Sequence, residues 1–108
     1  MTIRRCGKMK VVRKRPGEEP EICEIENTQE ALQEVLGGEP EYIRFSTDAS
    51  GVVRKNSKRL RPNTTFCGYQ VHGALLVVGY DGKTLSDLPK KFHQRALSWL
   101  GRRSLWRS

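Results

Sequence analysis

The chain has 108 residues, of which 36% are hydrophobic and 30% are charged, and its formal net charge at pH 7 is +8. This length fits a single domain with a small core. Three cysteines, Cys6, Cys23 and Cys67, are far apart and odd in number, which argues against a disulfide framework or a zinc site and for a reducing cytoplasm. No apolar run is long enough to span a bilayer or to act as a secretory signal, so we expect a soluble, cytoplasmic protein without a membrane partner.

Residues 1–8 read as a basic N-terminal arm. A first strand is predicted from Met9, and it ends at the turn sequence Arg15-Pro16-Gly17. Glu21–Ile25 alternates polar and apolar residues and predicts a second strand. Together these segments predict a β-hairpin.

A short helix is predicted over residues 28–36. Asn27 is the expected N-cap, and Glu30, three residues further on, would complete a capping box. Gly37-Gly38 supplies the left-handed stop at the C-terminal end.

Further strands are predicted at Tyr42–Phe45 and at Val52-Val53, with a turn at residues 48–51 between them. Residues 54–65 are rich in basic and polar side chains and predict a mobile loop. The nearly continuous apolar run Val71–Tyr80 predicts a strand at the centre of the sheet.

From Leu85 onward apolar residues recur at helical spacing, and Gly101 is the expected helix end. Residues 101–108 then form a basic tail that contains Trp106. The fold class is therefore α+β, roughly ββαβββα, with a small antiparallel or mixed sheet of about five strands and two helices on one face. The predicted domain covers residues 9–100.

Charge is sorted along the chain. Ten of the twelve acidic groups lie in residues 16–48, where Arg44 is the one basic group, so this segment has a net charge of −9 (1 − 10). The other 75 residues carry nineteen Lys and Arg and two Asp, a net charge of +17 (19 − 2). A fold gains nothing from sorting its charges in this way, whereas partner selection does, so the sorting predicts a polyanionic partner.

The predicted contacts with nucleic acid, or with another partner, are the basic residues of three runs: Arg13, Lys14, Arg15, Arg54, Lys55, Lys58, Arg59, Arg61, Lys90, Lys91, Arg95, Arg102 and Arg103. Such residues contact phosphates, and nearby Phe92, Trp99 and Trp106 would stack on bases. The predicted acidic patch for docking on a protein consists of Glu18, Glu19, Glu21 and Glu24.

Catalytic chemistry finds little support in the sequence. Residues 79–84 imitate the end of a phosphate-binding loop, but Val77 stands where that motif needs a glycine, so an Asp81-Gly82 turn is the better interpretation. A Cys67–His72 pair lacks an orienting partner, and His93 reads as a solvated side chain. We therefore predict no enzyme, no cofactor and no metal site.

From Met9 onward the chain resembles domain of unknown function 3846, a family of small uncharacterised domains of phages, plasmids and conjugative elements of gut bacteria. The resemblance rests on Met9-Lys-Val-Val with Pro16-Gly17, Glu24–Thr28, Leu32-Gln33 through Gly37-Gly38, and Gly73–Gly79. They cover about residues 9–85. The basic segment 54–61 and the tail depart from the family pattern, in which Met9 is the usual start.

The resemblance implies a mobile-element protein in a bacterial host, where small proteins of this kind often inhibit host defences. Our first hypothesis is a non-enzymatic inhibitor of a defence nuclease, with an RNA-guided CRISPR effector as the expected target, that binds the nucleic-acid-bearing surface of this ribonucleoprotein complex. One alternative is a nucleic-acid-binding accessory protein of a phage or plasmid with no inhibitory role. A weaker alternative is a nucleic-acid-processing enzyme.

Overall fold

The computed structural model describes residues 8–107, and the side chains of residues 8–100. The predicted N-terminal arm lies outside the described residues except for Lys8, which begins the first strand.

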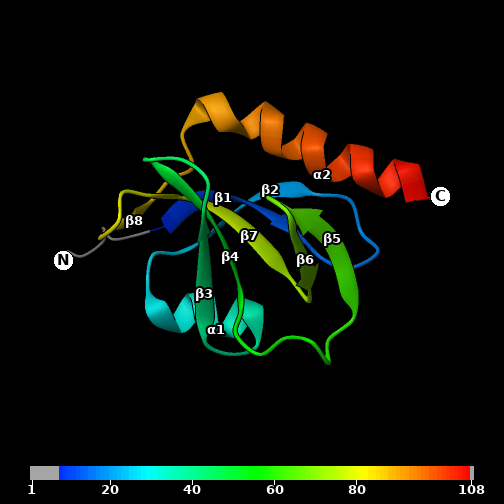
Figure 1. Ribbon diagram of the computed structural model, residues 1–108. Coiled ribbons are helices and arrows are strands. Elements are labelled where there is room, and N and C mark those ends of the chain that lie inside the picture. The colour runs from blue at the N-terminus through cyan, green and yellow to red at the C-terminus, as the bar shows by residue number, and fades with distance from the viewer. Residues whose placement is uncertain (1–7, 108) are drawn as a thin grey trace.

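The fold is α+β, as predicted, and every paired strand is antiparallel. Its elements in chain order are β1 (Lys8–Lys14), β2 (Glu21–Glu26), α1 (Gln29–Leu36), β3 (Pro40–Arg44), β4 (Ala49–Arg54), β5 (Pro62–Phe66), β6 (Tyr69–His72), β7 (Leu75–Tyr80), β8 (Leu85–Ser86), a 3-10 turn (Lys90–Phe92) and α2 (His93–Arg107). The main sheet has the strand order β2-β1-β7-β4-β3, with β8 paired to the end of β7, and β5 and β6 form a separate two-stranded sheet (Figure 1).

The predicted β1–β2 hairpin is confirmed. The register pairs Met9 with Ile25 and Val12 with Ile22, and Glu18 N donates to Arg15 O (3.1 Å) across the turn that contains Pro16. This turn forms where proline and glycine supply the backbone angles it needs.

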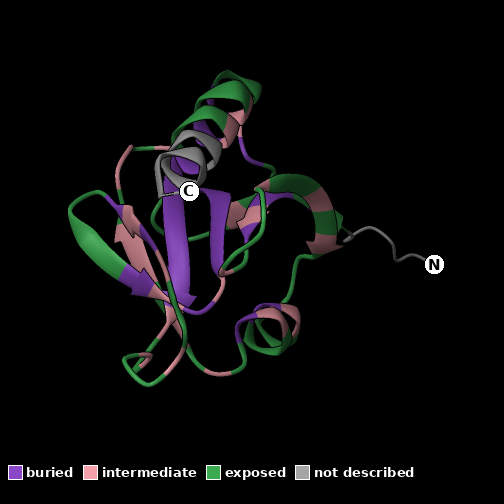
Figure 2. Cartoon of the chain, turned by 90° about the vertical axis from the view of Figure 1, so that its right-hand side faces the viewer, coloured by how far each residue is buried: buried purple, intermediate pink, exposed green. Residues whose placement is uncertain are grey.

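The central strand β7 is buried on both sides, which explains its nearly continuous apolar sequence. Because neighbouring side chains of a strand point to opposite faces, Leu75 and Val77 pack with α2, whereas Leu76 and Val78 pack with α1. The two helices therefore cover opposite faces of the sheet, and the prediction that both lie on one face is wrong. Figure 2 shows the buried strands between the two helices.

The predicted strand over residues 71–80 is divided in two. Gly73 has a φ of +79°, and its N–H donates to Arg61 O (2.8 Å) rather than to a neighbouring strand. An extended chain cannot continue through that backbone conformation. The residues before Gly73 belong to β6, which crosses over the main sheet, and those after Ala74 belong to β7.

The β5–β6 hairpin occupies part of the predicted loop over residues 54–65 and packs on the same face as α2. Phe66 and Val71 enter the core there. The ring of Phe66 lies directly on the backbone of Gly51 in β4, where a Cβ would stand 2.5 Å from Phe66 Cε2. Because Gly51 has no side chain, Phe66 can pack directly on β4, and this contact holds the hairpin against the sheet.

Helix α1 begins one residue later than predicted. Its N-cap is Thr28, whose Oγ1 accepts a hydrogen bond from Ala31 N (3.1 Å), and the predicted cap residue Asn27 instead donates through Nδ2 to Leu85 O (2.9 Å). The predicted stop is confirmed, because Gly37 adopts the left-handed conformation (φ +82°) and its N–H donates to Gln33 O (2.7 Å).

The Thr28→Ala variant should lower the free energy of unfolding by about 1 kcal/mol, because the Ala31 N–H would lose its acceptor. In a domain of this size that is a fall in melting temperature of roughly 4–8 °C. Thr28→Ser retains the hydroxyl and should melt close to the wild type in the same calorimetric scan. Equal melting of the alanine and serine variants would contradict the cap assignment.

The predicted turn at residues 48–51 is shorter than expected, since β4 already begins at Ala49. Near the other end of the chain, residues 85–86 form β8 rather than the start of a helix. The predicted helix end at Gly101 is also wrong, because α2 continues to Arg107. A glycine inside a helix costs only about 1 kcal/mol, which neighbouring residues can offset.

Candidate functional site

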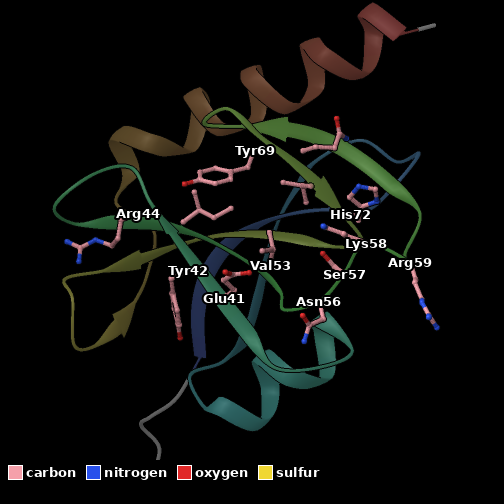
Figure 3. Close-up of a pocket in the computed structure, with 13 residues that line it drawn as sticks. Glu41, Tyr42, Arg44, Val53, Asn56, Ser57, Lys58, Arg59, Tyr69 and His72 are labelled. Atoms are coloured by element: carbon pink, nitrogen blue, oxygen red, sulfur yellow. The ribbon is translucent and has the colours of Figure 1, made fainter.

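The described surface has a groove between the outer strand β3 and the β5–β6 hairpin (Figure 3). Its volume is about 920 Å³, within the ~300–1,000 Å³ range usual for ligand pockets. The lining residues come from three segments: Glu41, Tyr42, Ile43 and Arg44 of β3, Asn56, Ser57, Lys58 and Arg59 of the connection after β4, and Tyr69, Gln70, Val71 and His72 of β6, with Val53 of β4 beneath them.

The floor of this groove is apolar. Val53 and Val71 are buried in the core cluster under α2, and Ile43 packs against that cluster. Glu41 pairs in register with Val53, so both side chains stand on the groove face of the sheet. Figure 3 shows Val53, Lys58 and Tyr69 turned toward the groove, and Arg44, Tyr42 and Arg59 turned away from it.

Arg44 is held on the other face of β3. Its guanidinium carbon lies 5.4 Å from the ring centre of Tyr80, and its nitrogens donate to the carbonyls of Ser46 (3.3 Å) and Thr47 (3.2 Å). Tyr80 is stacked on Tyr42, with ring centres 4.7 Å apart. Arg44 therefore stiffens the end of β3, and the groove meets mainly its backbone.

The first predicted basic run is engaged inside the protein. Arg13 forms an ion pair and hydrogen bond with Glu21, and Arg15 lies 3.8 Å from Glu18. The hydrogen bond from Arg13 lowers the pKa of the Glu21 carboxyl. These two cations are thus shared with the acidic residues of their own hairpin.

Lys14 has to be removed from the predicted binding surface, because its side chain is only 2% exposed. Its Nζ donates to Arg15 O (3.0 Å) and to Asn63 Oδ1 (3.1 Å), while Asn63 Nδ2 donates to Lys14 O and to Gly73 O (both 2.8 Å). Burial lowers the pKa of the Lys14 ammonium. This polar network joins the end of β1 to the start of β5 and to the bend before β7.

The second basic run provides the cations nearest the groove. Lys58 and Arg59 line it, and in the described part of the chain neither of them forms an ion pair. Arg61 lies against Gly17, and Arg54 packs against Gly38. Lys55 approaches Glu39 at 4.0 Å.

The third basic run is divided. Lys91 lies 3.2 Å from Asp48 and also over the ring of Phe92, so it links the 3-10 turn before α2 to the turn before β4. Lys90 and Arg95 are exposed and form no ion pair among the described residues. The side chains of Arg102 and Arg103 lie outside the described residues, as does that of Trp106.

Sorting of charge along the sequence has a structural consequence that composition did not reveal. All four ion pairs of the described residues join an acidic group of residues 16–48 to a basic group outside that segment. The expectation that a fold gains nothing from sorted charge is therefore too strict. Exposed pairs of this kind each contribute only about 0–1 kcal/mol, so their effect on stability is small.

The predicted acidic patch keeps two unpaired members. Glu18 and Glu21 pair with arginines of the same hairpin, whereas Glu19 and Glu24 are exposed and form no ion pair in the described part of the chain.

The catalytic candidates are occupied by structural contacts. His72 Nδ1 lies 3.0 Å from Leu60 O, and His93 Nε2 lies 2.8 Å from Leu88 O. A carbonyl oxygen only accepts, so each of these ring nitrogens carries the hydrogen. Burial raises the pKa of the Cys67 thiol, which opposes the thiolate that a Cys67–His72 pair would need.

The Asp81-Gly82 turn is confirmed. Asp81 Oδ1 accepts from Thr84 N (2.8 Å) and Lys83 N (2.9 Å), and these hydrogen bonds lower the pKa of its carboxyl. The helical spacing from Leu85 predicted that a helix would follow this turn, but the turn leads into β8. Among the described residues no three His, Cys, Asp or Glu side chains are grouped so that they could hold a metal ion. None of the helices in this part of the chain is long and apolar enough to cross a membrane.

The groove and its exposed aromatic residue, Tyr69, were not predicted from the sequence. This side chain is 60% exposed, the largest value among the big apolar and aromatic residues of the described chain. Cys67 and Gly68 form the two-residue hairpin turn before it, and both have positive φ values (50° and 83°). Gly68 was the available sequence signal, because turns of this kind favour glycine. A hairpin there would have placed Tyr69 at the start of a strand.

Fold and groove define a class: a small antiparallel α+β domain with a groove between two strand edges. The chain belongs to the family described as domain of unknown function (DUF3846), which matches residues 9–100. The match therefore extends beyond residue 85 into α2, and it includes the basic segment 54–61. No curated protein and no solved structure matches the chain.

Proposed function

We propose that this protein is a non-enzymatic binding protein that attaches to a polyanionic surface through residues 58–61 and the adjoining groove. One observation carries the proposal. Among the described side chains of the three basic runs, only this segment combines several cations without ion pairs and a neighbouring groove, whereas residues 13–15 are engaged internally. Phosphate contacts need only such free Lys and Arg groups at a surface.

The partner we propose is the nucleic-acid-bearing surface of a bacterial defence nuclease, with an RNA-guided effector as the first candidate. Effectors of this kind hold a guide–target heteroduplex in a basic channel and also carry guide RNA and a displaced single strand, so an inhibitor that binds there meets both phosphates and protein arginines. The unpaired Glu19 and Glu24 would face such arginines while Lys58 and Arg59 face phosphates. The family resemblance supports the mobile-element setting, and the charges support the mode of binding.

The test is neutralisation of the three basic residues of segment 58–61, of which Lys58 and Arg59 line the groove. Lys58→Gln, Arg59→Gln and Arg61→Gln together should abolish inhibition of cleavage by an RNA-guided nuclease and weaken binding to its ribonucleoprotein. Each lost phosphate contact should also reduce the slope of log K against log salt by ~0.7–0.9. Melting temperature should change little, because exposed substitutions alter stability by about 0.5 kcal/mol or less.

A matched control neutralises three cations that lie away from the groove: Lys8, Lys10 and Lys83. Both triple variants have a net charge of +5 (8 − 3), so a general charge effect would act on them equally. Binding that survives the groove substitutions at physiological salt would refute the proposal for this segment. Tight binding to naked nucleic acid without inhibition of any nuclease would instead favour the accessory-protein alternative.

A further inference from the structure

Tyr69 differs from the other aromatic residues of the described chain, because its exposed ring makes no contact that stabilises the fold. It is 60% exposed, and among the described residues it makes no ring contact and no side-chain hydrogen bond. The other aromatic residues differ, because Phe45 contacts Phe66, Phe92 and Trp99, and Tyr42 stacks on Tyr80. An aromatic ring placed at the mouth of a groove without a partner is the arrangement by which proteins stack on unpaired bases.

The charged side chains of the groove occupy different positions relative to Tyr69. Lys58 extends toward the groove at the end away from Tyr69, and Arg59 lies on its outer side (Figure 3). Glu41 stands beside Val53 on the groove face of β3 (Figure 3). A carboxylate repels phosphate and accepts hydrogen bonds from exocyclic amino groups such as cytosine N4. The groove is therefore suited to a phosphate at Lys58 and to the edge of a base at Glu41.

The hairpin that carries Tyr69 is held firmly in place. Phe66 packs directly over Gly51, and the hydrogen bonds between Lys14 and Asn63 join the start of β5 to the end of β1. The hydrogen bond from Gly73 N–H to Arg61 O (2.8 Å) closes the base of the hairpin. Because these contacts exist without a ligand, the groove needs little reorganisation to bind one, and this lowers the entropic cost of binding.

We propose that the groove binds unpaired nucleotides of a single-stranded nucleic acid, with one base on the Tyr69 ring and a phosphate at Lys58. This inference rests on the proposed function and specifies the form of nucleic acid that is recognised. An extended peptide added along the free edge of β3 is the rival occupant. The free ring of Tyr69 and the free cations match a nucleotide better, and Pro40 removes one backbone donor from that edge.

The experiment compares Tyr69→Ala with Tyr69→Phe, which retains the aromatic face. Probes are fluorescein-labelled 12-mers of C and of U, each as RNA and as DNA, together with a 12-bp duplex, and binding is measured by anisotropy. Tyr69→Ala should weaken single-strand binding roughly 5- to 150-fold, since one base–aromatic stack contributes that much. Tyr69→Phe should bind as the wild type does. The wild type should prefer single strands to the duplex.

Two further readouts separate stacking from simple charge attraction. Tyr69→Ala should leave the salt dependence of binding unchanged, whereas Lys58→Gln should reduce the slope of log K against log salt by ~0.7. The C 12-mers should bind more tightly than the U 12-mers, and Glu41→Ala should remove that preference. RNA and DNA versions of one sequence show which of the two sources the groove prefers.

Equal affinity of Tyr69→Ala and the wild type, or equal affinity for single strand and duplex, would overturn this inference. Insensitivity to Tyr69→Ala is also what an extended peptide on β3 would give, because strand addition depends on backbone groups. The proposed function fails by a different result, namely binding that survives neutralisation of residues 58, 59 and 61. The two proposals can therefore fail separately.

Discussion

Val77→Asp is expected to unfold the domain. Val77 is fully buried at the centre of β7, where it pairs in register with Val12 on one side and Gly51 on the other. An unpaired carboxylate at that position costs several kcal/mol, comparable with the whole free energy of unfolding of a small domain, about 5–15 kcal/mol. Lys14 lies on the same face, but its ammonium is already bonded to Arg15 O and Asn63 Oδ1.

The measurement is circular dichroism with thermal melting, and Ile22→Asp is the control. Ile22 is also β-branched and sits opposite Val12 on β2, but it is 42% exposed at the edge of the sheet. Its carboxylate variant stays in water and should remain folded. A folded Val77→Asp protein would remove β7 from the core.

Gly51→Ala is expected to have the second largest effect on stability, because it places a methyl group where Phe66 of the β5–β6 hairpin packs on the sheet. The new Cβ would lie 2.5 Å from Phe66 Cε2 and 3.1 Å from Phe66 Cδ2, closer than carbon atoms approach. Phe66 is buried and cannot turn aside freely. Overpacking of this kind typically costs about 1–3 kcal/mol, and here it should also displace the side of the groove that carries Tyr69.

A double-mutant cycle tests this explanation. Phe66→Leu alone should destabilise the protein, because it leaves space above Gly51. When it is combined with Gly51→Ala, it should restore part of the stability that Gly51→Ala removes. The coupling free energy should exceed the roughly 0.3–0.5 kcal/mol scatter seen for independent sites. Additive effects on the urea midpoint would show that Gly51 and Phe66 do not share one contact.

Local patterns predicted the elements well. Alternation and the Pro-Gly turn identified the β1–β2 hairpin, and the apolar run identified β7 as the central strand. The helix stop at Gly37 followed from the one residue type that adopts positive φ at little cost. The N-cap was displaced by one residue because Asn27 has a partner in β8, far away in sequence, that a local rule cannot include.

The candidate site was predicted only as a set of charges. Lys58 and Arg59 were in that set, but so was Lys14, and nothing in the run 13–15 distinguishes the buried lysine from the more exposed arginines on either side. The distinction arises where β5 packs beside the end of β1 and covers Lys14 with Asn63. Tyr69 carried no local signal of its own, since its exposure depends on where β6 crosses β4.

The sequence by itself determined the α+β class, most strand and helix positions, and a positive charge concentrated outside residues 16–48. These properties depend on side-chain periodicity, backbone preference and composition, which act over a few residues. Only the tertiary structure decided that the helices take opposite faces of the sheet, that four basic groups pair with the acidic segment, and that β3 and β6 border a groove. The physical reason is that these features arise from contacts between residues distant along the chain, whose formation depends on how whole elements pack.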